Sequence, residues 1–309
     1  MHNDLIADEE QGTVAFIHEA LEMCMFETLT QVGLPIALIM IMTGVGMTLR
    51  LSNFTEVLRQ PKAFIVGVVA QMVLLPLTAV VLIALFGLTG ELAVGLFILA
   101  LCPGGTTSNL YSYLCKADVG LSVSLTALVG LLTPFTLPLL AAWAIEFYLG
   151  ANTAFSLPLV KTWLTLMIVS VLPVFLGMFV KSKWPAFAER VQPAISRFSV
   201  IVLLLLIISI ATDLGSDLWL FLVQSGPAAL TLNVLTMAGG YWLGKIVLAN
   251  DTQAKTICLE VGLQNGTLAL LITTGILSNS TMSIAPSVYS LLMFFTASLF
   301  TVWVLKFKK

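Results

Sequence analysis

The sequence predicts an all-α membrane protein that crosses a lipid bilayer about nine times. Of its 309 residues, 59% are hydrophobic and only 10% are charged, whereas a soluble domain carries roughly 25% charged residues. Repeated apolar runs of about 20 residues match the thickness of the hydrocarbon core. Because lipid offers the backbone no hydrogen bonds, and because the runs are continuously apolar, we expect helices rather than the alternating strands of a barrel.

The predicted spans follow one another with short polar connections and form a single membrane domain over residues 29–309. The first 28 residues hold seven acidic residues and no Lys or Arg, the opposite of the basic start of a signal peptide. We therefore expect residues 1–28 to be an acidic segment outside the membrane. The nine predicted spans are 29–49, 63–87, 91–115, 119–146, 157–180, 196–214, 217–247, 253–277 and 282–305.

The basic residues predict the orientation of these spans. With the N-terminus outside, 13 of the 14 Lys and Arg residues fall at inner connections, and Lys161 alone lies near the outer side. This bias fits the positive-inside rule, so we expect a multi-pass protein of the plasma (inner) membrane with a cytoplasmic C-terminus. The inner basic residues are Arg50, Arg59, Lys62, Lys116, Lys181, Lys183, Arg190, Arg197, Lys245, Lys255, Lys306, Lys308 and Lys309.

Two spans are interrupted near mid-depth. Residues 91–115 contain Pro103-Gly104-Gly105 followed by four polar residues, and residues 253–277 contain Glu260-Val261-Gly262-Leu263-Gln264-Asn265-Gly266. Pro and Gly weaken a helix, and corresponding interrupted spans are typical of a transporter's binding site. Since the third and eighth spans run in opposite directions, they predict inverted repeats, with spans 1–4 mirroring spans 6–9. The alternative is two kinked helices that pack closely.

Glu260 is the only acidic residue in the middle of an apolar span. A charge at that depth costs about 2.5–3.5 kcal/mol on insertion scales, and no Lys or Arg lies at a comparable depth to neutralise it. We therefore expect Glu260 to bind an imported cation, either Na⁺ or a proton. The structural alternative is a protonated carboxyl group that forms hydrogen bonds between helices.

Oxygen-bearing residues favour Na⁺ over a bare proton, because a hard cation needs several oxygen ligands. Ser122 and Thr126 are four residues apart and share a helix face, as do Glu260 and Gln264. Each Ser or Thr taken singly is more often bonded to its own helix, but together they could hold about two ions. The expected oxygen ligands are the side chains of Gln71, Ser108, Asn109, Ser122, Thr126, Glu260 and Gln264, together with unwound backbone carbonyls.

The second half of each interrupted span begins near Thr106 or Asn265. A helix N-terminus carries free N–H groups and the positive end of the dipole, which suits an anionic substrate. Thr106 and Asn265 would add neutral donors, unless these N–H groups meet only water or capping side chains. The sequence has no basic patch for nucleic acid and no hydrolase, P-loop or dinucleotide motif, so we expect a protein that is not an enzyme.

The segments Pro103–Asn109 and Glu260–Asn265 resemble two signatures of the bile acid:sodium symporter family, and the likeness extends from about residue 33 to the C-terminus. The resemblance implies a core domain with crossing broken helices, a panel domain, and alternating access driven by Na⁺. It implies two sodium sites, with Thr106 and Asn265 facing an organic anion between the domains. The first site would use Ser108, Asn109, Ser122, Thr126 and Glu260. The second would use Gln71, Glu260, Gln264 and the carbonyls of Val261 and Leu263.

Two features depart from this family pattern. Bacterial members commonly have ten spans, so nine spans are closer to the animal bile-acid carriers. Phe294 and Phe295 stand where some bacterial members have a polar pair, which argues against a small polar substrate, although family members also carry pantoate and pyruvate. A proton-coupled or uniport organic anion carrier, and a membrane sensor that binds ligand without transport, remain alternative readings. No obligate protein partner is evident.

Overall fold

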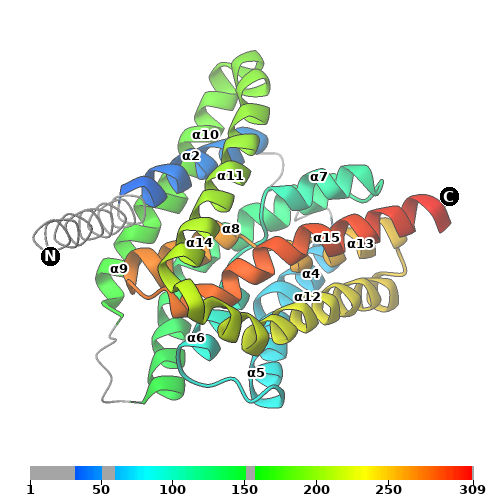
Figure 1. Cartoon of the computed structure of the whole chain (residues 1–309). Helices are drawn as coiled ribbons and strands as arrows, with labels where there is room; N and C mark the ends of the chain where they lie inside the picture. The colour runs from blue at the N-terminus through cyan, green and yellow to red at the C-terminus, as the bar shows by residue number, and fades with distance from the viewer. Residues whose placement is uncertain (1–31, 51–59, 151–156, 308–309) are drawn as a thin grey trace, which may run out of the picture.

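The computed structural model describes residues 32–50, 60–150 and 157–307, and every regular element in these ranges is a helix (Figure 1). The predicted acidic segment 1–28 lies outside them, as do Arg59, Lys308 and Lys309. The helices of the first half are α2 (Leu34–Thr48), α4 (Pro61–Val69), the π segment η2 (Ala70–Leu74), α5 (Leu75–Leu85), α6 (Gly90–Leu101), α7 (Thr107–Leu114) and α8 (Val119–Leu149).

The second half of the chain continues in the same way. Its elements are α9 (Leu159–Leu166), the π segment η3 (Met167–Val171), α10 (Leu172–Lys183), α11 (Pro185–Leu214), the 3-10 turn η4 (Gly215–Asp217), α12 (Leu218–Leu248), α13 (Asp251–Gly262), α14 (Gly266–Leu270), the π segment η5 (Leu271–Ile276), the 3-10 turn η6 (Thr281–Ser283) and α15 (Ile284–Phe307). Each predicted span therefore contains helix.

Five helical runs of the described chain are long and apolar enough to cross a membrane. They are Pro61–Leu85, Val119–Leu149, Leu159–Lys183, Pro185–Leu248 and Thr281–Phe307. The fourth run holds both α11 and α12, joined by η4. Large apolar side chains point away from the protein on these runs, for example Val81 at 63% and Ile246 at 76% exposure. Apolar outward faces on several long helices are those of a polytopic membrane protein.

One predicted boundary differs clearly from the structure. The sixth span was expected to start at residue 196, but α11 begins at Pro185. Proline is favoured in the first turn of a helix because the N–H groups of that turn have no acceptor within the helix, so a missing N–H costs nothing there. The expected start followed the apolar run, whereas the helix begins at the proline and continues through Pro193.

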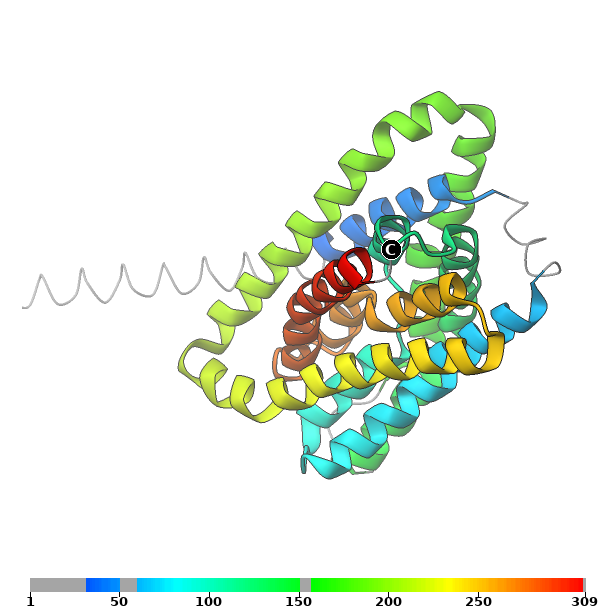
Figure 2. The ribbon, with the colours of Figure 1, turned by 90° about the vertical axis from the view of Figure 1, so that its right-hand side faces the viewer.

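The helices pack as two groups. One group holds α2, α10 and α11, and the other is built around α12, α13, α15, α6 and α8. Within the first group α2 and α10 come very close, because a Cβ on Gly46 would meet the Val174 carbonyl and a Cβ on Gly177 would meet the Thr43 carbonyl. Figure 2 shows α11 running diagonally along one side, with α15 between it and α12.

The two interrupted spans cross at their breaks. The Gly105 N–H donates to the Leu263 carbonyl at 2.7 Å, and the Asn265 N–H donates to the Pro103 carbonyl at 2.9 Å. Gly104 and Gln264 thus form an isolated antiparallel bridge. Each break satisfies backbone groups of the other, as unwound backbone at membrane depth requires.

Candidate functional site: an oxygen-lined carboxylate beside a pocket

Glu260 lies near the end of α13 and is 1% exposed. Three hydroxyl groups from the other interrupted span and from α8 surround its carboxylate. Its Oε2 accepts hydrogen bonds from Ser108 Oγ at 2.7 Å and Ser122 Oγ at 3.2 Å, and its Oε1 accepts one from Thr126 Oγ1 at 2.5 Å. The structure therefore brings together four of the residues predicted for the first ion site.

No ion pair neutralises Glu260 within the described residues. Lys255, the basic residue closest to it along α13, pairs with Asp251 Oδ2 at 2.9 Å at the start of the helix. A carboxylate buried in this way is held only by neutral hydroxyl groups, and an isolated buried charge is very costly. The arrangement can accept a cation without displacing a basic side chain.

Asn109 supplies the second sign of a cation site. It follows Ser108 on α7, and its Oδ1 atom is buried with no hydrogen-bond partner in the part of the chain that the structure describes. Buried polar atoms are nearly always paired, so this orphaned oxygen, on the residue after a serine that bonds Glu260, is available to a positive ion. Side-chain and backbone oxygens are the ligands that hard cations such as Na⁺ prefer.

Gln71 and Gln264 form a second polar cluster at the crossing. Gln71 stands in the π segment η2, and its Nε2 donates to Gln264 Oε1 at 2.7 Å and to the Cys102 carbonyl at 3.0 Å. Gln264 Nε2 donates to the Val261 carbonyl at 2.7 Å. The Leu263 carbonyl, which accepts from Gly105, lies at the same crossing. Gln71, Gln264 and the carbonyls of Val261 and Leu263 are thus four of the five groups predicted for the second ion site; the fifth, Glu260, forms its side-chain hydrogen bonds with Ser108, Ser122 and Thr126.

A pocket lies between the two groups of helices. Its empty space, including the part that opens outward, is about 690 Å³. One wall is almost entirely apolar, and Ser170 is its single polar residue. The opposite wall carries the polar groups of the two breaks. The first wall is formed by Ile41, Met42, Val45, Ser170, Val174, Val200 and Leu203. The second is formed by residues 103–107, 264–267, Thr126, Ala127, Gly130, Leu131, Met293 and Phe294.

Both predicted donors to a substrate line this pocket. Thr106 is half-buried directly before α7, and Asn265 is 8% exposed directly before α14. Asn265 Oδ1 caps α14 by accepting from the Leu268 N–H at 3.0 Å. Thr126 also lines the pocket while it donates to Glu260, so one side chain joins the carboxylate to the pocket wall.

The predicted aromatic pair is divided by the structure. Phe294 lies in the pocket wall, but Phe295 is 63% exposed and does not line the pocket. Consecutive residues on a helix point about 100° apart, so one helix face cannot present both rings to the pocket.

Comparison with known proteins identifies the family of this chain. The model of the Sodium Bile acid symporter family matches residues 35–218, which is more than half of the chain. The chain belongs to the sodium bile acid symporter family. The family is one of transporters. The matched part of this chain includes α2 from its second residue onward, the first interrupted span and the hydroxyl residues of α8.

Individual relatives come from distant organisms. An uncharacterized sodium-dependent transporter of Bacillus subtilis is 30% identical over 85% of this chain and 76% of its own length. A probable chloroplastic sodium/metabolite cotransporter of rice, Oryza sativa, is 30% identical over 90% of this chain and 64% of its own length. The human ileal sodium/bile acid cotransporter is 26% identical over 89% of this chain and 79% of its own length.

Several buried polar residues near the breaks are not among the residues predicted from the sequence. Asn233 and Tyr289 are both fully buried, and both donate to the Gly262 carbonyl. Asn233 was recognisable as an amide inside an apolar run, like Gln71. No sequence signal marked Tyr289 or the pocket residue Ser170.

Proposed function

We propose that this protein is a sodium-coupled symporter of an organic anion. The observation that carries the proposal is Glu260, a carboxylate 1% exposed that three hydroxyl groups surround and no basic side chain of the described residues pairs. Its burial is compensated when a cation enters with the substrate. An uncompensated buried charge is costly. Binding of a cation therefore stabilises the arrangement in which these helices bury Glu260.

Two sodium ions fit the available oxygens. The first site uses Ser108, Asn109, Ser122, Thr126 and Glu260, with the orphaned Asn109 Oδ1 as its strongest support. The second site uses Gln71, Glu260, Gln264 and the carbonyls of Val261 and Leu263. In this second site the Gln71 amide nitrogen donates to Gln264 Oε1, and the Gln264 amide nitrogen donates to the Val261 carbonyl. These two oxygens can bind an ion only after the amide groups rotate and release them.

The pocket suits an amphipathic organic anion. Thr106 and Asn265 offer neutral donors at the starts of α7 and α14, and helix N-termini favour negative groups. No Lys or Arg of the described ranges lines the pocket, so the charge of the substrate would be balanced by the co-transported sodium. The facing wall and Phe294 are apolar and would cover a hydrophobic body. A bile acid, the cargo in the name of the human relative, has this division, and so do other organic acids with an apolar body.

The position of the pocket between the two groups of helices supports alternating access. The group formed by α2, α10 and α11 would move as a panel against the core that carries both breaks. Thr126 touches Glu260 and also the pocket, so an ion at the first site would alter the wall that the substrate contacts. The inward sodium gradient of a plasma membrane would then drive uptake, with the N-terminus outside.

A thermal-shift screen of organic anions, in NaCl against KCl at constant pH, tests the proposal on the purified protein. A ligand that binds only the native state raises its stability, so a substrate of a symporter should stabilise the protein in NaCl and not in KCl. Stabilisation that is equal in both salts but changes with pH would favour the proton-coupled or uniport alternative. Counterflow in proteoliposomes separates transport from a sensor that only binds.

Glu260→Gln is the decisive variant, because it keeps the shape of the side chain and removes the charge. We expect sodium-driven uptake to fall by at least about 100-fold, since removing one partner of a buried charge pair costs about 3–5 kcal/mol. Thr126→Val removes one neutral ligand and should cost less. Normal sodium-driven uptake by Glu260→Gln would reject the proposed ion sites.

A further inference from the structure

The Gly262 carbonyl is held from the side of α12 and α15. Gly262 is the last residue of α13, so its carbonyl is among those left free at a helix end. It accepts from Asn233 Nδ2 at 2.8 Å and from the Tyr289 hydroxyl at 3.1 Å. Both donors are 0% exposed. Two buried side chains from two helices thus converge on one backbone oxygen.

A third side chain fixes the direction of the Asn233 amide. Thr296 Oγ1 donates to Asn233 Oδ1 at 2.5 Å, which leaves Nδ2 directed at Gly262. Thr296 and Tyr289 both belong to α15, whereas Asn233 belongs to α12. We call Asn233, Tyr289 and Thr296 the Gly262 clamp.

The carbonyls on either side of Gly262 face different partners. The Val261 carbonyl accepts from Gln264 Nε2 at 2.7 Å, and the Leu263 carbonyl accepts from the Gly105 N–H at 2.7 Å. Because each peptide unit is planar, rotation of the Gly262 carbonyl would change the backbone dihedrals that direct its neighbours. The clamp therefore determines where the Val261 and Leu263 oxygens point.

We propose that Asn233 and Tyr289 are positioning residues for the second sodium site. They touch neither ion nor substrate, and they act by holding the Gly262 peptide so that the Val261 and Leu263 carbonyls face the crossing. This inference rests on the proposed sodium-coupled function, because the second sodium site is part of that proposal. The clamp would affect sodium affinity first and substrate affinity only through it.

Tyr289→Phe is the first test, because it removes the hydroxyl and keeps the buried ring. The purified protein is titrated with NaCl at constant ionic strength, with thermal stability as the measure of ion binding. We expect the sodium concentration at half-effect to rise about fivefold, the size of one neutral hydrogen bond, while the Tm in KCl shifts little. In proteoliposomes the substrate KM at saturating sodium should stay within about twofold of wild type.

Thr296→Val provides a second variant, because it loosens the Asn233 amide without removing a donor to Gly262. It should raise the sodium midpoint in the same direction. Tyr241→Phe makes the same chemical change on α12, at a hydroxyl that bonds Asp251, and should leave the midpoint unchanged.

The outcomes separate this inference from the function on which it rests. A wild-type protein that does not respond to sodium rejects both. A sodium-responsive wild type, with Tyr289→Phe and Thr296→Val variants that lose stability in KCl but keep the wild-type sodium midpoint, overturns the clamp alone and makes these residues purely structural.

Discussion

At the scale of single residues, the close approach of Gly104 to Glu260 is specific to glycine. A Cβ at position 104 would lie 2.8 Å from Glu260 Cδ and would also meet Oε1. Gly104→Ala should push the carboxylate away from its three hydroxyl donors. Overpacking of this kind costs roughly 1–3 kcal/mol, so we expect sodium-driven uptake to fall by at least about fivefold.

Gly239→Ala is the matched control for this prediction. Gly239 lies in α12, and a Cβ there would meet only the Leu74 side chain at 3.7 Å, an ordinary van der Waals contact. Alanine is also the better helix former, so the control should keep uptake and stability. Equal uptake by the two variants would show that position 104 tolerates a side chain. It would also show that transport does not depend on the present position of the Glu260 carboxylate.

Phe294 and Phe295 form a second matched pair of residues. Phe294 lines the pocket, whereas Phe295 is 63% exposed on the outer face of α15. Phe294→Ala removes apolar surface from the substrate wall, and a partly buried ring is worth about 1–2 kcal/mol. We therefore expect the KM of the Phe294→Ala variant for large apolar anions to rise about 5- to 30-fold, and its KM for small anions to rise less. Phe295→Ala should leave KM unchanged, and similar effects of both changes would place the substrate elsewhere.

At the scale of helices, a cluster of charges fixes the start of α13. Asp251 accepts hydrogen bonds from Lys245 Nζ and the Tyr241 hydroxyl and forms an ion pair with Lys255. Partial burial raises the pKa of Asp251, but the hydrogen bonds and charges of Lys255 and Lys245 outweigh it, so the pKa is lowered from its ordinary value. The ionised form is therefore favoured by folding, and its contribution is present above the ordinary pKa of an Asp.

Asp251→Asn tests this contribution through its pH dependence. At neutral pH we expect the variant to melt a few degrees below the wild type, because both lysines lose their ionised partner. As the pH falls through the lowered pKa, Asp251 takes up a proton and the wild type loses the same stabilisation, so the two melting curves should converge. A difference in Tm that stays constant down to that pH would mean that Asp251 acts through its shape and not its charge.

The interrupted helices also show how far the sequence predicts this site. The breaks at Pro103-Gly104-Gly105 and Gly262 follow from local chemistry, because these residues weaken a helix wherever they occur. The grouping of Ser122 with Thr126 follows from helical periodicity. The pairing of Gly105 with Leu263 joins residues far apart in the chain, and no local pattern encodes it.

The same reasoning explains what the sequence did not predict. The orientation of Phe295 depends on how α15 is rotated against its neighbours, which packing decides. The contacts of Asn233 and Tyr289 with the Gly262 carbonyl likewise require α12 and α15 to meet behind the break. Polar residues in apolar spans can be recognised as unusual, but their partners are set by the tertiary structure.

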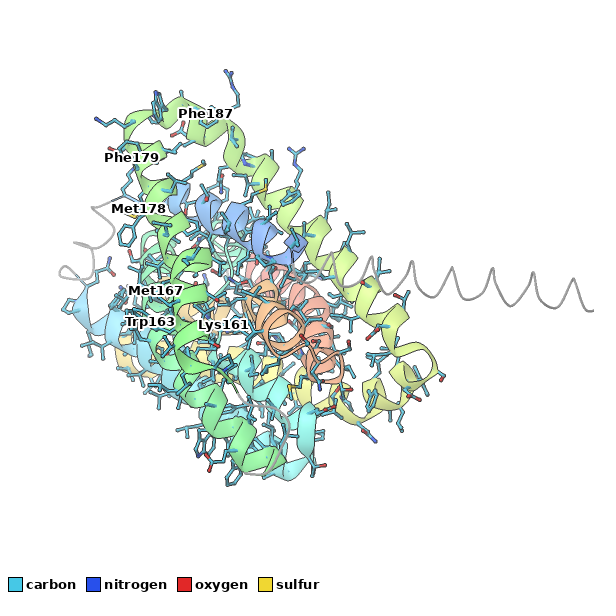
Figure 3. All side chains as sticks on the ribbon, turned by 90° about the vertical axis from the view of Figure 1, so that its left-hand side faces the viewer. Lys161, Trp163, Met167, Met178, Phe179 and Phe187 are labelled. Atoms are coloured by element: carbon cyan, nitrogen blue, oxygen red, sulfur yellow. The ribbon has the colours of Figure 1, made fainter. Side chains whose placement is uncertain are left out.

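At the scale of the whole molecule, the direction of transport depends on which face of the membrane each helix end meets. The helix from Leu159 to Lys183 carries Lys161 near one end and Lys183 at the other, and both side chains are exposed. Figure 3 shows the side chains along this helix, with Lys161 and Phe179 at different levels. A helix of this length spans about 37 Å, enough to cross the hydrocarbon core.

Cytoplasmic connections carry an excess of Lys and Arg. The orientation that places 13 of the 14 basic residues inside also places Lys183 inside and leaves Lys161 outside. We expect Lys161→Cys to react with a membrane-impermeant maleimide in intact cells, and Lys183→Cys to react only after permeabilisation. Cys102, Cys115 and Cys258 are buried, and replacing Cys24 by Ser gives a background with low labelling. The reverse labelling pattern would place the C-terminus outside. Sodium would then enter from the opposite side of the protein.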